Sequence, residues 1–311
     1  MRNKGRRPSG KLKKTLILLV SILLVLVGLI TATAAKVLYD VKGVTDEVYE
    51  PAKKTQPLDE VSLNQKKSFS VLLLGVDTGA LGRTERGRSD TLMVATVNPN
   101  TKKTVIVSIP RDTYTEIVGH DTMDKVNHAY AFGGVDMAAD TVAQLLAIPI
   151  NYYVVINMKG IETLVDSVGG IEVDNPFAFT YEETEFPAGS QYLNGNKALK
   201  YVRMRYDDPE GDYGRQGRQR EVIAGILKQM VSIKSLRNYH SILNSLGDNL
   251  QTDITFNDIE LLFRNYREAF NQVDSEQAMG EGFMLDEISY QSIPLDELIR
   301  IQTLLKEQLA N

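Results

Sequence analysis

Residues 91–110, TLMVATVNPNTKKTVIVSIP, decide the fold that this sequence predicts. Two apolar runs, 91–97 and 104–110, flank the turn-forming stretch NPNT at 98–101. Runs of this kind on either side of a short polar stretch predict a β-hairpin. The preceding run, SFSVLLLGV at 68–76, is apolar throughout and predicts a buried strand. This strand and the hairpin therefore form the predicted start of a central sheet.

Further helices and strands are predicted over the rest of the chain. The apolar periodicity predicts helices at 134–147, 158–170, 213–233, 256–271 and 294–309. Strands are predicted at 152–157 and 170–174, and residues 200–205 fit either a strand or a helix. Because strands alternate with helices, the chain predicts one α/β or α+β domain with a mixed central β-sheet flanked by helices.

The N-terminal segment predicts a membrane anchor. Residues 1–15 contain seven Lys and Arg side chains and no acid, and residues 16–35 are 20 residues without a charge. Such a run is long enough to cross a bilayer core of about 30 Å, and the basic flank places residues 1–15 in the cytoplasm. A cleaved signal peptide is the alternative, but the apolar run exceeds the usual length of its apolar region. We therefore expect a single-pass cell-membrane protein, with an extracytoplasmic stalk at 36–66 and a domain at 67–311.

The composition excludes several kinds of site. The chain has no cysteine, which excludes disulfides, cysteine-bound zinc and thiol catalysis. The three histidines, His120, His128 and His240, lack the spacing of metal ligands. The net charge is −5 in spite of the basic N-terminus, so the predicted domain is acidic and a nucleic-acid partner is not expected.

Arginines are clustered in this acidic domain. Of the 13 that follow residue 36, nine lie within 83–111 and 203–220. Arginine binds phosphate or carboxylate through two parallel hydrogen bonds, a geometry that lysine lacks. The clustering therefore suggests that an anionic group binds between these two stretches.

The first stretch combines carboxylates with arginines at predicted strand ends. Asp77 directly follows the buried strand 68–76, and a glycine-rich loop that includes Arg88 leads to Asp90. Carboxylates in such positions can hold Mg²⁺, which takes oxygen ligands and often shares them with a phosphate. Arg111 ends the third strand and would lie near both carboxylates if the strands are neighbours. The alternatives are that the carboxylates cap turns and that Arg111 belongs to a surface ion pair of little energetic value.

The second stretch places cations at the unfavourable end of a helix. Arg215, Arg218 and Gln219 share one face of the predicted helix 213–233, and Asp212 is the expected N-cap. The helix N-terminus carries partial positive charge, so these arginines oppose the helix dipole. A bound phosphate would resolve the conflict, because free backbone N–H groups and arginines would share it. Solvated arginines are the alternative.

Residues 201–205 add two further arginines before this helix. If that segment is extended, Arg203 and Arg205 point to the same side of it. The residues alone then indicate a membrane-tethered domain that binds a phosphate or pyrophosphate, with carboxylates for a divalent ion. No Ser-His-Asp arrangement, Walker loop or GxSxG motif offers a competing chemistry.

Six motifs in this order resemble the LytR-CpsA-Psr family of bacterial cell-envelope proteins. They are LLLGVD (72–77), GRSDT (87–91), SIPRDT (108–113), DKVNHAYAFGG (124–134), YVRMR (201–205) and DYGRQGRQ (212–219). The resemblance implies a phosphotransferase that moves a glycopolymer, such as teichoic acid or capsule, from a polyprenyl pyrophosphate carrier to peptidoglycan through a phosphodiester bond. It also implies a fold that encloses an apolar channel for the lipid chain.

The resemblance implies a role for each matching residue. Catalysis would fall to Asp90, Arg111 and Asp77, with Asp90 the candidate base. The Mg²⁺ ligands would be Asp77, Asp90 and Asp212. The pyrophosphate would be bound by Arg88, Arg111, Arg203, Arg205, Arg215, Arg218 and Gln219.

Two other functions fit the same sequence. A hydrolase would use the same residues on a lipid pyrophosphate, with water as the acceptor. A non-enzymatic membrane regulator of envelope gene expression would not need the arginines. The predicted cytoplasmic tail has no room for a DNA-binding domain, which weighs against the regulator.

Overall fold

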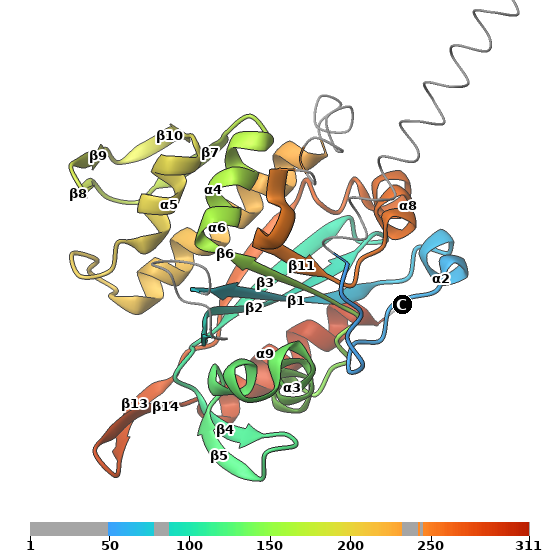
Figure 1. Ribbon diagram of the computed structural model, residues 1–311, viewed down its shortest axis with the longest axis horizontal. Helices are drawn as coiled ribbons and strands as arrows, with labels where there is room; N and C mark the ends of the chain where they lie inside the picture. The colour runs from blue at the N-terminus through green and yellow to red at the C-terminus, as the bar shows by residue number, and fades with distance from the viewer. Residues whose placement is uncertain (1–48, 78–86, 232–241, 243–244, 311) are drawn as a thin grey trace, which may run out of the picture. The chain divides into compact units, whose positions relative to one another are not determined.

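The predicted hairpin is present at the centre of a six-stranded sheet in the computed structural model (Figure 1). It consists of β2 (Ser89–Asn98) and β3 (Lys103–Ile109), which run antiparallel. The side chain of Asn98 sets the turn, because its Oδ1 accepts hydrogen bonds from the backbone N–H groups of Asn100 and Thr101 at 2.9 and 3.0 Å.

The structure describes residues 49–77, 87–231, 242 and 245–310. The predicted tail and membrane helix, 1–15 and 16–35, lie outside these residues. In the described part of the chain, no helix combines the length and the apolar character that a membrane crossing requires.

The sheet is mixed, as predicted, with the strand order β11-β6-β1-β2-β3-β12. Its other strands are β1 (Phe69–Val76), β6 (Tyr152–Asn157), β11 (Leu250–Thr252) and β12 (Val273–Gln277). β6 is parallel to β1, β12 is parallel to β3, and β2 is antiparallel to both β1 and β3. The last residues of β1, β6, β3 and β12 therefore lie beside the first residues of β2, at an end of the sheet that we call the carboxyl edge.

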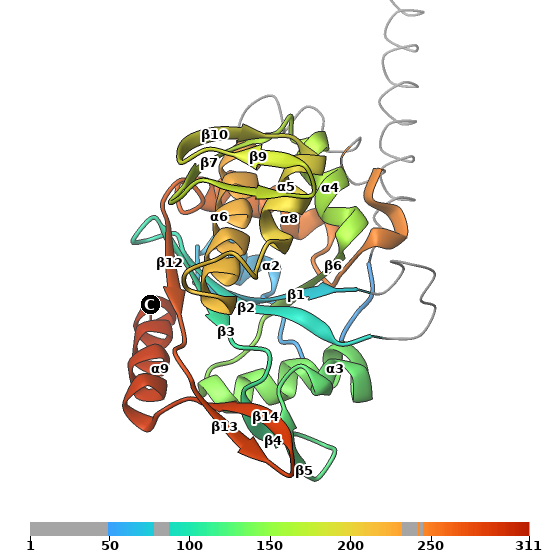
Figure 2. The ribbon, with the colours of Figure 1, turned by 90° about the vertical axis from the view of Figure 1, so that its left-hand side faces the viewer.

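Helices cover both faces of the sheet (Figures 1 and 2). On one face α3 (His128–Leu146) and α9 (Leu295–Leu309) pack on a core that includes Leu72, Val94 and Val142. On the other face lie α2 (Glu60–Asn64), α6 (Asp212–Met230) and α8 (Phe256–Tyr266). Successive strand residues point to opposite faces, so a strand buried on both sides has the near-continuous apolar sequence seen at 68–76.

The remaining helices resolve one open alternative. They are α4 (Met158–Ser167), which ends before the glycine pair at 169–170, and α5 (Gly195–Arg203). Residues 201–203 are therefore helical, and the extended conformation considered for YVRMR is wrong. Arg203 ends α5, and Arg205 lies in the loop that leads to α6.

Residues 49–66 are part of the folded unit, although a stalk was expected at 36–66. The backbone N–H of Glu50 donates to Thr252 at 2.9 Å, and that of Gln56 donates to Ile150 at 2.8 Å. Leu63 on α2 is fully buried against the core beneath α8. Because the segment is polar, its composition does not predict these contacts with the folded unit.

Among the described residues, four two-stranded sheets lie outside the main sheet, and only one of their strands was predicted. They are β4 (Tyr114–Ile117) with β5 (Thr122–Lys125), β7 (Ile171–Asn175) with β10 (Gly189–Leu193), β8 (Phe179–Tyr181) with β9 (Thr184–Phe186), and β13 (Glu281–Leu285) with β14 (Ile288–Ser292). Only β7 matches a predicted strand. The others are short and polar, so they lack the apolar runs on which strand prediction depends.

Candidate active site

The carboxyl edge joins the two motifs at the ends of β1, β2 and β3. Asp90 lies at the start of β2, and Arg111 follows β3; the Arg111 Nη1 to Asp90 Oδ1 distance is 2.6 Å. Gly75 allows β1 to approach β2, because a Cβ on Gly75 would lie 2.8 Å from the Cβ of Thr91. The register shifts just after Gly75, and Asp77 emerges beyond this irregularity at the same edge.

Arg111 is surrounded by carboxylates. Besides Asp90, its Nε lies 3.8 Å from the Oδ2 of Asp112, and Lys125 Nζ lies 2.8 Å from the Oδ1 of Asp112. Burial lowers the pKa of Arg111, but the charges of Asp90, Asp112 and Asp212 outweigh burial and raise that pKa overall. Arg111 therefore stays cationic at this edge.

The start of α6 brings two more arginines to the same place. Asp212 Oδ1 lies 2.7 Å from Arg215 Nη2 and 3.3 Å from Arg205 Nε. The pKa of Arg215 is lowered by burial and by the charges of Arg111 and Arg205, against the opposing charge of Asp212. The charges of Arg111 and Arg205 thus disfavour the cationic form of Arg215 at the carboxyl edge, and a bound anion would offset that repulsion.

A chain of buried side-chain hydrogen bonds fixes α6 on the sheet. Arg220 Nη1 donates to Ser108 Oγ on β3 at 2.7 Å and to Gln277 Oε1 on β12 at 2.6 Å. Gln277 Nε2 donates to Gln216 Oε1 at 3.0 Å, and Gln216 Nε2 donates to Asp212 Oδ2 at 3.0 Å. The position of Asp212 is therefore set from within the sheet. Sequence reasoning missed this chain, because the glutamines show no pattern until the fold brings them together.

Asp212 is not the N-cap of α6, contrary to the sequence prediction. The helix begins at Asp212, its N-cap residue is Gly211 with φ of 59°, and no side chain caps it. A positive φ is readily adopted by glycine alone, which explains Gly211 at this turn. The Asp212 carboxylate is thereby left to bind Arg205 and Arg215.

Arg218 lies in the interior, away from the cluster where the sequence placed it. Its side chain is 2% exposed and forms an ion pair with Asp208. Its Nε donates to the carbonyl oxygen of Tyr201 at 3.0 Å, and Nη2 donates to that of Met204 at 2.5 Å. These contacts hold the 204–211 loop from beneath, so Arg218 has a structural role in this geometry.

Three other predicted site residues, Arg203, Arg88 and Gln219, are outside this set of contacts. Arg203 is half-exposed and pairs with Glu182 at 3.2 Å, while Arg88 is exposed just before β2. Gln219 lies one helical turn after Arg215, and its buried Oε1 has no hydrogen-bond partner among the described residues. Asp77 lies at the carboxyl edge, because it directly follows the last residue of β1. The loop arginines Arg83 and Arg86 fall outside the described residues.

An exposed tyrosine beside the cluster escaped the sequence analysis. Tyr206 is 94% exposed, and the guanidinium carbon of Arg205 lies 5.9 Å from the centre of its ring. A tyrosine adjacent to an arginine motif could have been noticed, but its exposure follows only from the loop that Asp208 and Arg218 hold in place.

Of the three carboxylates expected to bind Mg²⁺, two are placed where they could hold the ion. Asp77 and Asp90 end adjacent strands at one edge and offer carboxylate oxygens. Mg²⁺ in proteins often takes one or two carboxylates and completes its shell with water and substrate phosphate. Asp212 is already engaged by two arginines. In the described part of the chain, no three acidic or histidine side chains are grouped as a preformed metal site.

Comparisons with known proteins agree on one family. The LytR_cpsA_psr family model matches residues 36–307. The polyisoprenyl-teichoic acid–peptidoglycan teichoic acid transferase TagU of Enterococcus faecalis is 49% identical over 300 residues, which cover 96% of this chain and 99% of the relative. Two similar solved structures differ in how they are described.

The first, described as a transcriptional regulator from Enterococcus faecalis, has 46% identity and a TM-score of 0.72, and the match covers 79% of this chain and 89% of that chain. The second, TagU of B. subtilis, has 42% identity and a TM-score of 0.65, and the match covers 79% of this chain and 98% of that chain.

The role of Arg218 can be separated from substrate binding by stability measurements. Replacing Arg218 with methionine leaves Asp208 as a buried unpaired charge, so we expect the free energy of unfolding to fall by about 3–5 kcal/mol. The matched variant Arg203→Met breaks a half-exposed ion pair and should cost about 0–1 kcal/mol. Urea unfolding followed by circular dichroism measures both. An Arg218→Met variant of unchanged stability would contradict the structural role.

Proposed function

Because this chain belongs to the LytR_cpsA_psr family, we propose that it transfers a teichoic acid from a polyisoprenyl pyrophosphate carrier to peptidoglycan. The observation that carries the proposal is the cluster formed by Asp90, Arg111, Arg205, Asp212 and Arg215 at the carboxyl edge. It provides several guanidinium groups around one point, with carboxylates beside them. This arrangement suits a pyrophosphate group that must be held and then cleaved.

The proposed reaction is a phosphoryl transfer. The oxygen of a peptidoglycan hydroxyl forms a bond to the phosphorus that carries the glycopolymer. The bond from that phosphorus to the bridging pyrophosphate oxygen breaks, and its electron pair leaves with the polyisoprenyl phosphate. The hydroxyl proton passes to a base. The glycopolymer is then joined to peptidoglycan through a phosphodiester, and no oxidant or reductant is required.

The arginines act on charge that grows at the leaving phosphate. The charges of Arg111 and Arg205 act against that of Arg215 in the free protein, and a bound pyrophosphate would offset that repulsion. They would stabilise the leaving group more strongly as its bond to phosphorus breaks, which is what accelerates a reaction. Asp212 holds two of them in fixed positions.

Asp90 is proposed as the base for the acceptor hydroxyl, and Asp77 and Asp90 are proposed as the holders of a divalent ion. Asp90 is the candidate base, and its ion pair with Arg111 fixes its position. Mg²⁺, when bound by Asp77 and Asp90, would supply a Lewis acid for the phosphoryl oxygens. The carboxylates would then serve chiefly to hold and orient the phosphate.

We propose that the domain acts outside the cytoplasm from a single N-terminal anchor. The support is the charge-free run at 16–35 after the basic residues 1–15. This placement suits a reaction between a lipid-linked donor and the cell wall, because one substrate is confined to the membrane and the other lies beyond it.

The product defines the function. We expect the full-length protein, a polyprenyl-pyrophosphoryl oligosaccharide and peptidoglycan fragments to give a phosphodiester-linked conjugate detectable by mass spectrometry. Omission of Mg²⁺ with added EDTA should abolish the conjugate if a divalent ion takes part. Release of a free phosphorylated sugar regardless of acceptor would indicate the hydrolase, and absence of turnover would favour the non-enzymatic regulator.

The cluster itself can be tested at Arg111. We expect Arg111→Ala to lower kcat by about 100- to 1,000-fold, because one charged donor to the transition state is lost. Arg264→Ala is the matched control: Arg264 is exposed on α8 and forms only an ion pair with Glu260 on the same helix. Both variants should keep the circular dichroism spectrum of the parent. A folded Arg111→Ala variant with full activity would rule out this site.

The topology can be tested with protease. When trypsin is added to intact protoplasts, we expect the domain to be degraded while an epitope tag placed at residue 1 survives. Permeabilised protoplasts, in which the tag should also be lost, are the control. Protection of the domain in intact protoplasts would contradict the proposed orientation.

A further inference from the structure

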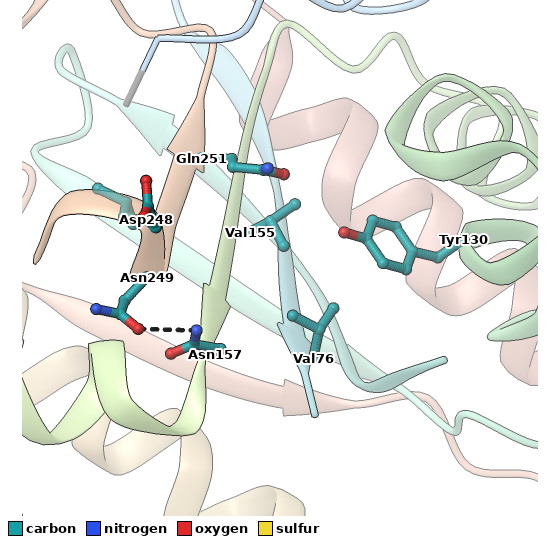
Figure 3. A pocket seen from close by; sticks show the side chains of 8 residues that line it. Val76, Tyr130, Val155, Asn157, Asp248, Asn249 and Gln251 are labelled. Carbon is teal, nitrogen blue, oxygen red and sulfur yellow. Dashed lines mark hydrogen bonds between the residues drawn. The ribbon is translucent and has the colours of Figure 1, made fainter. Parts of the chain in front are cut away.

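A second feature of the carboxyl edge is a small cavity at the ends of β1 and β6, which we call the β1–β6 cavity (Figure 3). Its volume is about 140 Å³. It is lined by Val76, Tyr130, Val155, Asn157, Asp248, Asn249, Leu250 and Gln251. None of these residues belongs to the arginine cluster.

The strand register explains why these side chains meet. Val76 pairs with Asn157 in the parallel ladder, and Val155 pairs with Gln251 in the antiparallel ladder. Paired residues of neighbouring strands point to the same face of a sheet, so Val76, Val155 and Gln251 lie on the face covered by α3. Asn157, at the end of β6, turns toward Asn249 and the start of α4. Tyr130 on α3 closes the cavity from the opposite side, with its ring pointing toward Val155 (Figure 3).

The cavity has an apolar floor and a polar rim. Val76, Val155 and Leu250 are buried, whereas Asp248 and Gln251 are exposed. To the described residues, the side chains of Asp248 and Gln251 make no hydrogen bond or ion pair. They are thus available to a ligand.

Between the apolar floor and the polar rim, the cavity wall is formed by Asn157 and Asn249, whose side chains are held in place by hydrogen bonds within the protein. Asn157 Nδ2 donates to Asn249 Oδ1 at 3.0 Å, as the dashed line in Figure 3 shows. Asn157 Oδ1 also accepts from the backbone N–H of Gly160 at 2.8 Å, and Asn249 Nδ2 donates to the carbonyl oxygen of Leu246 at 3.0 Å. A rigid wall of this kind lowers the entropic cost of binding.

The chemistry of the lining selects a neutral, polyhydroxylated ring. No cation lines the cavity and Asp248 does, so a phosphate is disfavoured. The polar rim and the small volume of about 140 Å³ disfavour a lipid chain. A sugar ring offers apolar C–H faces to the valines and hydroxyl groups to a carboxylate and an amide, which accept and donate hydrogen bonds.

The cavity adjoins the candidate active site on two sides. Val76 immediately precedes Asp77 on the chain. The backbone N–H of Asn127 donates to the carbonyl oxygen of Arg111 at 3.3 Å, and Tyr130 follows three residues later. A ring bound here therefore stands beside the groups proposed to act on the phosphate.

We propose that the β1–β6 cavity binds one sugar ring of a glycan substrate, and this inference rests on the proposed transferase function. The sugar would come either from the peptidoglycan acceptor or from the glycopolymer of the donor. Val76 pairs with Ser89, which precedes the candidate base Asp90, and this position favours the acceptor.

Variants of Gln251 test the proposal without disturbing the fold, because the side chain is exposed. Gln251→Ala removes one hydrogen bond and should raise one substrate's KM by about three- to tenfold. Gln251→Trp obstructs the cavity and should raise it further, with kcat nearly unchanged. Gln272→Ala and Gln272→Trp are matched controls, because Gln272 is an exposed glutamine beyond the opposite end of the sheet, just before β12.

The two sources of sugar give different kinetic results. A rise in acceptor KM alone assigns the cavity to peptidoglycan, and a rise in donor KM alone assigns it to the glycopolymer. Both results support a sugar site. Unchanged KM values for both substrates in folded Gln251→Ala and Gln251→Trp would overturn it.

Direct binding keeps this inference separate from the proposed reaction. Saturation-transfer NMR with a soluble peptidoglycan disaccharide, and separately with a phosphate-free oligosaccharide of the donor, requires no turnover. We expect a signal with the full-length protein and the Gln272 variants and its loss in Gln251→Trp. A protein that binds the glycan but transfers nothing would refute the transferase and retain the sugar site. Equal signals in all proteins, or none in any, would refute the sugar site.

Discussion

The contact of Arg220 with Ser108 and Gln277 is the constraint on which the rest of the site depends. It fixes α6 against β3 and β12, and through Gln216 it fixes Asp212. Burial lowers the pKa of Arg220 to about 10, and the opposing charges of Glu276 and Glu210 offset burial only in part. Burial of this arginine costs free energy, but its several N–H donors can link β3 and β12 to α6. That geometry explains why a cation occurs so near the start of α6.

The three arginines of α6, Arg215, Arg218 and Arg220, therefore have three different roles. Arg220 fixes the helix to the sheet, and Arg218 holds the 204–211 loop through Asp208. Only Arg215 faces the cluster, where Asp90, Asp112 and Asp212 lie among Arg111, Arg205 and Arg215. The guanidinium groups come from three separate segments rather than from one helix end. An anion would bind where those segments meet, and α6 contributes its partial charge in addition.

Sequence reasoning recovered the central hairpin, the mixed sheet and the adjacency of Asp90 and Arg111, because apolar runs and strand order determine them. It failed where tertiary contacts decide. Gln216 and Gln277 lie far apart in sequence, so their bond could not be anticipated. Arg218 matched a binding motif, yet burial beside Asp208 assigns it to the interior. Asp212 resembled an N-cap, but Gly211 occupies that position. A residue type in a motif predicts chemistry, whereas burial and partners decide which role it has.

The placement of the β1–β6 cavity bears on the choice between transfer and hydrolysis. Water needs no binding site. A glycan loses translational and rotational freedom when it binds, so contacts with the protein must offset that entropy loss if its hydroxyl is to compete with water. A rigid wall built by Asn157 and Asn249, together with an apolar floor, can provide that hold next to Asp77. The arginine cluster serves the leaving phosphate equally well in either reaction. Selectivity for the glycan acceptor would therefore arise from the cavity at the carboxyl ends of β1 and β6, and not from the arginines.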